Sequence, residues 1–184
     1  MEKIITPEDL ASFSFRPEEV ECVRFEQCDL SGLDLSSVIF IECTFLDCNL
    51  SNANLSRTSF RECSFITCKL VGLRFDDCIP FLQPPIFKNC DLKLASFTSI
   101  KLHSVHFERC KLHEADFTNA DLSNAVFIES DLKGAIFQNT DLRQADLQTS
   151  FHYSIDPERN RIKHLKVIRD GLAGFLDKYE LDIQ

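Results

Sequence analysis

Seven of the nine cysteines recur at regular intervals, which makes thiol chemistry the first possibility to consider. They fall in two series, Cys28, Cys48, Cys68, Cys90 and Cys110 in one and Cys43 and Cys63 in the other, with steps of 20 residues except for one of 22 from Cys68 to Cys90. Thiolates are preferred zinc ligands, but a zinc ion needs four donors that converge on one point. Regular spacing places these thiols side by side in rows instead, so they do not converge on one point. Cys is also a compact apolar residue that fills narrow interiors. We therefore predict packing positions, with no metal ion and no cofactor.

No other pattern predicts catalysis. The five histidines are His103, His106, His113, His152 and His164, and none stands with a Cys or a carboxylate in a nucleophile arrangement. The sequence has no G-x-S-x-G, P-loop or dinucleotide-binding fingerprint. Cys22 and Cys78 lie outside the two cysteine series, and Cys78 is the candidate for a reactive thiol because it lies near a break in the repeat. We predict that the protein is not an enzyme and has no catalytic residue.

A shorter repeat underlies the cysteine spacing. Phe or Leu occupies every fifth position from Phe25 to Phe75 and again from Phe87 to Leu147, 24 positions without exception. We call these positions centres; a small or apolar residue stands two positions before each of them. A period of five fits neither a helix at 3.6 residues per turn nor a strand at 2.0. The chain must therefore turn once per unit, and four units close one coil. We predict an all-β protein, a quadrilateral parallel β-helix, with two inward side chains on each side of the coil.

Stacked coils require residues four units apart to share an environment. The centres of one column are Phe25, Phe45 and Phe65, and those of the next are Leu30, Leu50 and Leu70. The step from Phe75 to Phe87 is longer than a whole number of units, and a two-residue insertion there restores both columns in the second half of the chain. We therefore expect an interior filled by side chains, with no cavity for a substrate.

Residues 76–86 interrupt the repeat. The segment DDCIPFLQPPI contains three Pro and one unfilled centre, for which Pro80 and Leu82 are both candidates. Because Pro cannot donate to a parallel ladder, we expect a bulged corner or short loop here. Its candidate partner-binding residues are Asp76, Asp77, Phe81 and Gln83. A tolerated insertion and a binding loop both remain possible interpretations of the segment.

The repeat divides the chain into an N-terminal cap (1–22), a β-helix (23–149, with the break at 76–86) and a C-terminal region (150–184). Thr6–Asp9 has the cap, N1 proline and acidic first turn of a short helix. Residues 153–155 and 162–167, joined by a turn at 156–160, predict a hairpin. Apolar residues from Ile168 to Tyr179 recur at helical spacing and predict a closing amphipathic α-helix that covers the last coil.

The repeating unit, as in Ala53-Asn54-Leu55 and Ala115-Asp116-Phe117, resembles that of the pentapeptide repeat family. The resemblance covers residues 23–149 and implies a right-handed quadrilateral β-helix. Within the family, the length, the Cys-rich first half, the break and the stretches at 87–92 and 155–160 resemble the microcin-immunity and quinolone-resistance branch. That branch implies a DNA mimic that binds DNA gyrase or another type II topoisomerase and protects it from an antibiotic or a microcin. The family also implies a homodimer, with Leu172, Phe175, Leu176 and Tyr179 as the candidate interface.

The net charge of −9 argues against direct binding to nucleic acid and favours a basic partner. Residues 1–75 contain 12 acidic and 7 basic side chains, residues 76–150 contain 11 and 7, and residues 151–184 contain 6 and 6. A rod with this excess presents a DNA-like surface to a basic cleft. Asp before a centre equally serves turn geometry and solubility, so both interpretations of the charge remain.

Outward apolar residues form a stripe along the predicted coil. Leu46 and Ile66 stack one coil apart, with Ile86 near them and Val126 and Ile128 farther along. The stripe either lies under the N-terminal segment or meets a partner. The alternative function is therefore a rigid protein–protein interaction scaffold with no topoisomerase role.

The expected location is the cytoplasm, with reduced thiols. The N-terminal sequence MEKIITPEDL has neither a cationic n-region nor an apolar h-region. No apolar run approaches the roughly 20 residues of a membrane-spanning helix. We expect no contact with a membrane.

Overall fold

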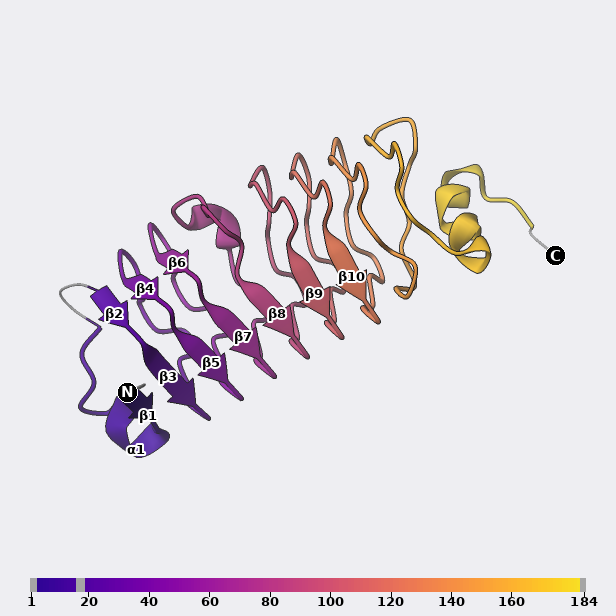
Figure 1. Ribbon diagram of the computed structural model, residues 1–184. Helices are drawn as coiled ribbons and strands as arrows, with labels where there is room; N and C mark the ends of the chain where they lie inside the picture. Colours follow the sequence, from indigo (N-terminus) through magenta and orange to yellow (C-terminus); the bar gives the residue numbers. More distant parts are fainter. Residues whose placement is uncertain (1–2, 16–18, 183–184) are drawn as a thin grey trace.

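The computed structural model describes residues 3–15 and 19–182, which form a rod of stacked coils (Figure 1). Its described strands make a seven-stranded and a three-stranded parallel sheet. The first follows the order β1 (Lys3–Ile5), β3 (Val23–Glu26), β5 (Thr44–Leu46), β7 (Ser64–Ile66), β8 (Ile86–Lys88), β9 (His106–Glu108) and β10 (Val126–Ile128). The second follows the order β2 (Glu19–Glu21), β4 (Ile39–Ile41) and β6 (Ser59–Arg61).

The register confirms the predicted parallel β-helix. Phe25 pairs with Phe45 and Phe45 with Phe65, each time one coil farther along the chain. Phe65 then pairs with Phe87, so the two-residue insertion is taken up between them as expected. The rings of Phe45 and Phe65 stack with centroids 4.9 Å apart. The right-handed sense of the coil remains an expectation from the family resemblance.

Each corner of the coil lies two residues after a centre. The backbone there takes a left-handed conformation, with φ of 56° at Asn52, 53° at Glu62 and 69° at Gly72. The Asp or Asn before a centre accepts a hydrogen bond across the same corner, as Asn54 Oδ1 does from the backbone N–H of Ser56 at 3.0 Å, where the left-handed residue is Arg57. These bonds stabilise corners without Gly, so turn geometry accounts for the Asx residues of the repeat.

The break contains a short 3₁₀ helix, η1 (Phe75–Asp77), and an outward excursion of the chain. Neither candidate for the unfilled centre enters the core, because Pro80 is exposed and the side chain of Leu82 is 94% exposed. Phe81 and Cys78 instead pack partly against the core. The expectation for Pro80 and Leu82 is therefore wrong: the inserted chain must bend outward to rejoin the register at Phe87, and Leu82 lies on that bend.

The N-terminal segment extends the stack. Helix α1 (Pro7–Leu10) begins where predicted, and the carboxylate of Asp9 accepts a hydrogen bond from the backbone N–H of Thr6 at 3.0 Å. Farther along, Phe13 and Phe15 pack on Phe25, with ring centroids 5.5 and 5.9 Å away. The helix and these rings thus cover the first coil, while β1 and β2 pair onto it. Residues 1, 2 and 16–18 of the predicted cap lie outside the described residues.

The predicted C-terminal hairpin is wrong. Residues after 149 continue the parallel coil instead, because Asp141 bridges to Arg161 and Asp146 to Lys166 in parallel register. The last predicted coil has unpaired backbone groups along its edge, and the following chain satisfies them. The spacing contained this signal, since Ile162 lies one full coil after Leu142.

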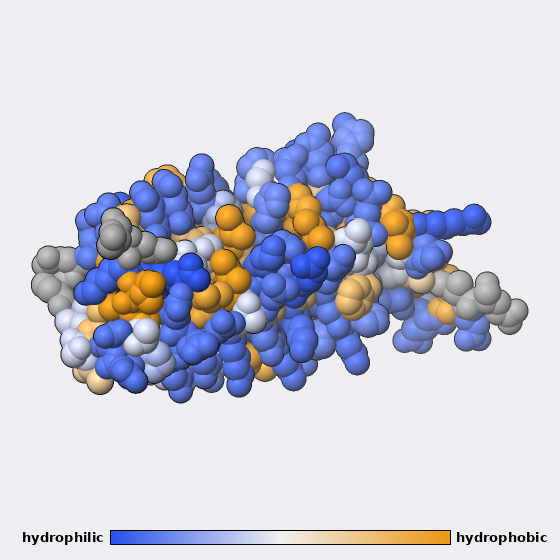
Figure 2. All heavy atoms as spheres, turned by 60° about the horizontal axis from the view of Figure 1, so that its bottom comes forward, coloured by the Kyte–Doolittle hydropathy of each residue, from blue (hydrophilic) through white to orange (hydrophobic). Residues whose placement is uncertain are grey.

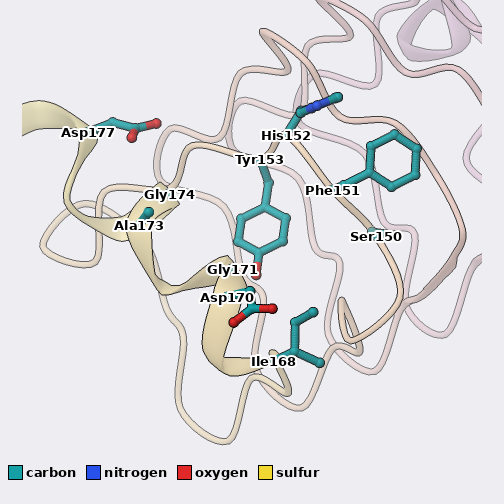
Figure 3. Close-up of a pocket in the computed structure, with 10 residues that line it drawn as sticks. All are labelled: Ser150, Phe151, His152, Tyr153, Ile168, Asp170, Gly171, Ala173, Gly174 and Asp177. Atoms are coloured by element: carbon teal, nitrogen blue, oxygen red, sulfur yellow. The ribbon is translucent and has the colours of Figure 1, made fainter. Parts of the chain in front are cut away.

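The closing α-helix is wrong as well. Its place is taken by two 3₁₀ helices, η2 (Arg169–Phe175) and η3 (Asp177–Tyr179). Tyr153 is buried beneath η2, where a Cβ at Gly171 would collide with its hydroxyl group and one at Gly174 with its carbonyl oxygen (Figure 3). In a 3₁₀ helix residues i and i+3 lie on the same side, so Gly171 and Gly174 both face Tyr153. The absence of a Cβ at each allows η2 to lie this close to Tyr153.

Candidate functional site

The cysteine series lies inside the coil, where the thiols act as hydrogen-bond donors. The Sγ of Cys48 lies 3.4 Å from the carbonyl oxygen of Phe25, and that of Cys68 lies 3.3 Å from the carbonyl oxygen of Phe45. Ser130 occupies the equivalent position later in the chain and donates to Phe107 at 3.2 Å. A small donor at this position therefore bridges successive coils. Within the described residues, no group of three or more His, Cys, Asp or Glu side chains is arranged to hold a metal ion.

The environment of the thiols opposes reactivity. Burial raises the pKa of Cys28 to about 11, assisted by Cys48. Burial, together with Asp77 and Asp76, raises the pKa of Cys78 to about 12. Since the thiolate is the nucleophile, Cys78 is a poor candidate for the reactive thiol predicted from its position. Cys22 is exposed, but partial desolvation of its thiol and the nearby carboxylate of Glu42 raise its pKa too.

Two histidines share one carboxylate near the C-terminal end. His113 Nε2 lies 2.7 Å from Asp131 Oδ2, and His152 Nδ1 lies 2.8 Å from Asp131 Oδ1. Burial by itself raises the pKa of Asp131, but hydrogen bonds from His113, His152 and the backbone of Lys133 more than offset this, so the pKa lies below its ordinary value of 3.8. The cluster joins the regular coil to the residues that precede η2.

We expect Asp131→Asn to lower the free energy of unfolding by about 1 kcal/mol at pH 7. This figure allows for the weakening of the lost hydrogen bonds by solvent, because the site is partly exposed. A lowered carboxyl pKa stabilises the fold above the unfolded-state value, and this stabilisation is lost as the pH falls below about 4. Urea titrations at pH 7 and pH 3 measure both effects. Asp91→Asn is the matched control, because Asp91 lies in the same column of the coil. Asp91 accepts a hydrogen bond from the backbone N–H of Lys93 but forms no ion pair in the described chain. An equal loss in the control would contradict the role of the histidines.

Carboxylates without a cationic partner gather near the N-terminal end. Glu21 ends β2, and Glu42 and Glu62 follow β4 and β6; all three are exposed and form no ion pair within the described residues. We term them the acidic edge. Several later carboxylates are compensated by Arg, as when Arg143 binds Asp141 at 2.6 Å and Arg109 binds Glu129 at 2.7 Å. Sequence reasoning missed this asymmetry, although Glu42 and Glu62 occupy equivalent positions in successive coils.

The candidate residues of the break are only partly available to a partner. Asp76 and Asp77 both bind Arg74, at 2.8 and 3.1 Å, so their charge is compensated locally. Phe81 is half-buried and Gln83 is exposed. Leu82 is the most exposed apolar side chain of the segment, whereas the sequence suggested it only as a core residue.

The apolar stripe lies on the outer face of the seven-stranded sheet. Leu46 pairs with Ile66 in register, and both are half-buried. Lys88 and Glu108 follow in the same column before Ile128. Figure 2 shows the result as separate apolar patches between polar side chains. The stripe is thus interrupted by charge rather than continuous.

The candidate interface residues at the C-terminus divide into two groups. Leu172 and Tyr179 are about half exposed, and Leu176 is 38% exposed. Phe175 faces inward, with its ring centroid 5.9 Å from that of Tyr153. The outward group therefore consists of Leu172, Leu176 and Tyr179.

None of the helices within residues 3–15 and 19–182 has the length and apolar character to cross a membrane.

Comparisons with known proteins concern the repeat. A model described as "Pentapeptide repeat region" matches residues 58–137 and 100–154, and one described as "Pentapeptide repeats (8 copies)" matches residues 21–57. No curated protein matches the chain. A trypsin-treated form of QnrB1, a plasmid-mediated fluoroquinolone resistance protein, is 19% identical with a TM-score of 0.46, over 99% of this chain and 98% of that one. HetL, involved in heterocyst differentiation regulation in Nostoc sp. strain PCC 7120, is 20% identical with a TM-score of 0.38, over 89% and 95%.

Proposed function

Since the chain belongs to the pentapeptide repeat family, whose models match residues 21–154 without a gap, we propose that it is a non-catalytic binding protein whose partner is DNA gyrase or another type II topoisomerase. It acts there as a DNA mimic and protects the enzyme from an antibiotic or a microcin. Side chains fill the coil, so recognition takes place on its outer surface. We propose the cytoplasm as its location, where its nine free thiols stay reduced.

The acidic edge is the observation that carries this proposal. Stacking from Ile5 to Val167 at ~4.8 Å per coil gives a rod of roughly 40 Å, hence about one net charge per 4 Å, against one per ~1.7 Å in duplex DNA. The average charge is therefore more dilute than that of DNA, so a DNA-like face needs carboxylates whose charge no nearby cation cancels. Glu42 and Glu62, in successive coils, meet this condition, because neither forms an ion pair within the described residues; the thiol of Cys22 donates to Glu42 at 3.7 Å without cancelling its charge. The layout shared with the microcin-immunity and quinolone-resistance branch favours a topoisomerase as the basic partner.

Supercoiling assays test the proposal directly. Purified protein is added to DNA gyrase, and separately to topoisomerase IV, with and without a fluoroquinolone or a gyrase-directed peptide toxin. We expect it to reduce supercoiling by gyrase, and decatenation by topoisomerase IV, at high concentration, or to restore these activities in the presence of the inhibitor. Absence of both effects with both enzymes would overturn the topoisomerase assignment. If a pull-down recovers another partner, and binding survives reversal of the acidic edge but not Leu46→Asp/Ile66→Asp, the scaffold function replaces it.

We also propose a homodimer through the outward apolar group of the C-terminal 3₁₀ helices. We expect Leu172→Asp/Leu176→Asp to convert a dimer into a folded monomer, because each Asp places a charge in an apolar interface. Phe175 is left unchanged, since it holds the segment against Tyr153. Light scattering measures the mass. Leu94→Asp/Ile136→Asp, at exposed apolar positions elsewhere on the coil, should leave the dimer intact. A wild-type monomer would refute this assembly.

A further inference from the structure

The break opens a groove in the wall of the coil. On this side the three-stranded sheet ends at β6, and the ladder resumes only at Lys101, which bridges to Asp121. Between them the chain runs outward through Leu82. A concave space of about 500 Å³ lies beside this excursion, within the range that binds small ligands and side chains. We call it the break groove.

The two walls of the break groove differ in chemistry. Phe81, Leu82 and Ile86 form an apolar wall. Lys101, His103 and His106 line the other. The walls meet where Ile86 pairs with His106 in the register of β8 and β9. An occupant must therefore be apolar on one side and anionic or polar on the other.

The cation of the second wall, Lys101, is unusual on this protein, whose net charge is −9. Lys101 and His106 are exposed and form no ion pair within the described residues. By contrast, the nearby Lys88 binds Glu108 at 3.1 Å. His103 Nδ1 lies 2.9 Å from the hydroxyl oxygen of Ser123, which orients its ring without neutralising the wall. The charge of Lys101 thus remains available to a ligand.

We propose that the break groove binds an extended acidic peptide segment of a partner protein, with one bulky apolar side chain seated against Phe81 and Leu82. Carboxylates on the same segment pair with Lys101 and accept a hydrogen bond from an N–H of His106. An apolar anchor in a concave site supplies affinity, and the charged rim supplies specificity and steering. This ligand is opposite in charge to the basic partner of the acidic edge, so the protein has two surfaces for chemically different partners.

A labelled hexapeptide, Asp-Glu-Leu-Phe-Asp-Glu, serves as the probe. Its control peptides are Lys-Lys-Leu-Phe-Lys-Lys, which reverses the charge, and Asp-Glu-Ser-Ser-Asp-Glu, which removes the apolar anchor. We expect fluorescence anisotropy to show binding of the first alone, weakening as salt rises. Amide shifts in ¹H–¹⁵N spectra should gather in residues 79–86 and 101–106. Failure of the acidic probe to bind, or equal binding of either control, would overturn the proposal.

Matched variants locate the site. Lys101→Glu should lower the affinity for the acidic probe at least tenfold, and Leu82→Ser about fivefold. Both positions are exposed, so the thermal unfolding midpoint should stay unchanged. Lys133→Glu makes the same charge change on another side of the coil and should alter affinity less than twofold. Equal losses for Lys101→Glu and Lys133→Glu would show only a net-charge effect. If the amide shifts of residues 79–86 change with protein concentration in the absence of peptide, the groove binds a second copy of this protein. Either this result or equal losses for the two Lys variants would contradict the proposal.

Discussion

Replacement of Phe107 by Asp is expected to abolish folding of the soluble rod. Phe107 is fully buried, and its ring stacks between those of Phe87 and Phe127, both 5.1 Å away. Phe97 and Phe117 also contact it edge-on. Removal of a buried Phe side chain costs about 3–5 kcal/mol, and an unpaired buried charge adds to this. The sum is comparable with the ~5–15 kcal/mol stability of a typical domain.

Soluble yield and circular dichroism measure this effect. His106→Asp is the matched control, because His106 is the exposed neighbour on the same strand, β9. It should fold as the wild type does. Phe107→Leu should also fold, with a modest loss, since Leu occupies equivalent centres elsewhere in the coil. A soluble, cooperatively folded Phe107→Asp variant would contradict the column assignment.

Reversal of the acidic edge is expected to remove most of the binding to a type II topoisomerase. Glu42→Lys/Glu62→Lys replaces two carboxylates, one coil apart and without an ion pair in the part of the chain that the structure describes, with cations that repel a basic cleft. We expect at least a tenfold loss of affinity, equivalent to about 1.4 kcal/mol, and a shallower dependence of affinity on salt. Both side chains are exposed at corners, so folding should be unaffected. Surface plasmon resonance at two salt concentrations measures the change.

Glu114→Lys/Glu129→Lys is the control for this variant. It makes the same change in charge at two corners with the same left-handed backbone, in the second half of the rod. Glu129 is already paired with Arg109, so it contributes little to the free negative surface. The control should retain most of the affinity. Equal losses would mean that total charge, rather than the acidic edge, governs binding.

Periodicity predicted the coil because each unit must satisfy the same local geometry. Two inward residues and one left-handed corner recur in every unit, and any error in register would expose Phe or Leu. Phe87 could therefore be placed opposite Phe65 before the intervening loop was known. The turn at Asp156 was also correctly located, since its Oδ1 accepts a hydrogen bond from the backbone of Glu158.

The chain leaving that turn was wrongly paired, because a local turn signal does not identify the strand to which the next segment binds. The edge of the preceding coil offers backbone groups that favour parallel addition, and Arg161 pairs there with Asp141. Helical spacing after Ile168 was likewise ambiguous between α and 3₁₀ structure. Close packing of Gly171 and Gly174 on Tyr153 accompanies the tighter 3₁₀ form.

Composition and spacing thus specify the parallel coil, its filled interior and its negative charge, because these properties repeat in every unit. Which charges remain available depends on which outward side chains meet, either one coil apart, as Arg109 and Glu129 do, or at positions that the repeat does not relate. Asp131 is held by His113 and His152, which lie 18 and 21 residues away, whereas Glu42 meets no cation in the described chain. The break groove arises in the same way, since its two walls come from an insertion and from the coil that follows it. Folding brings these residues together, and the surfaces available to partners follow from that arrangement.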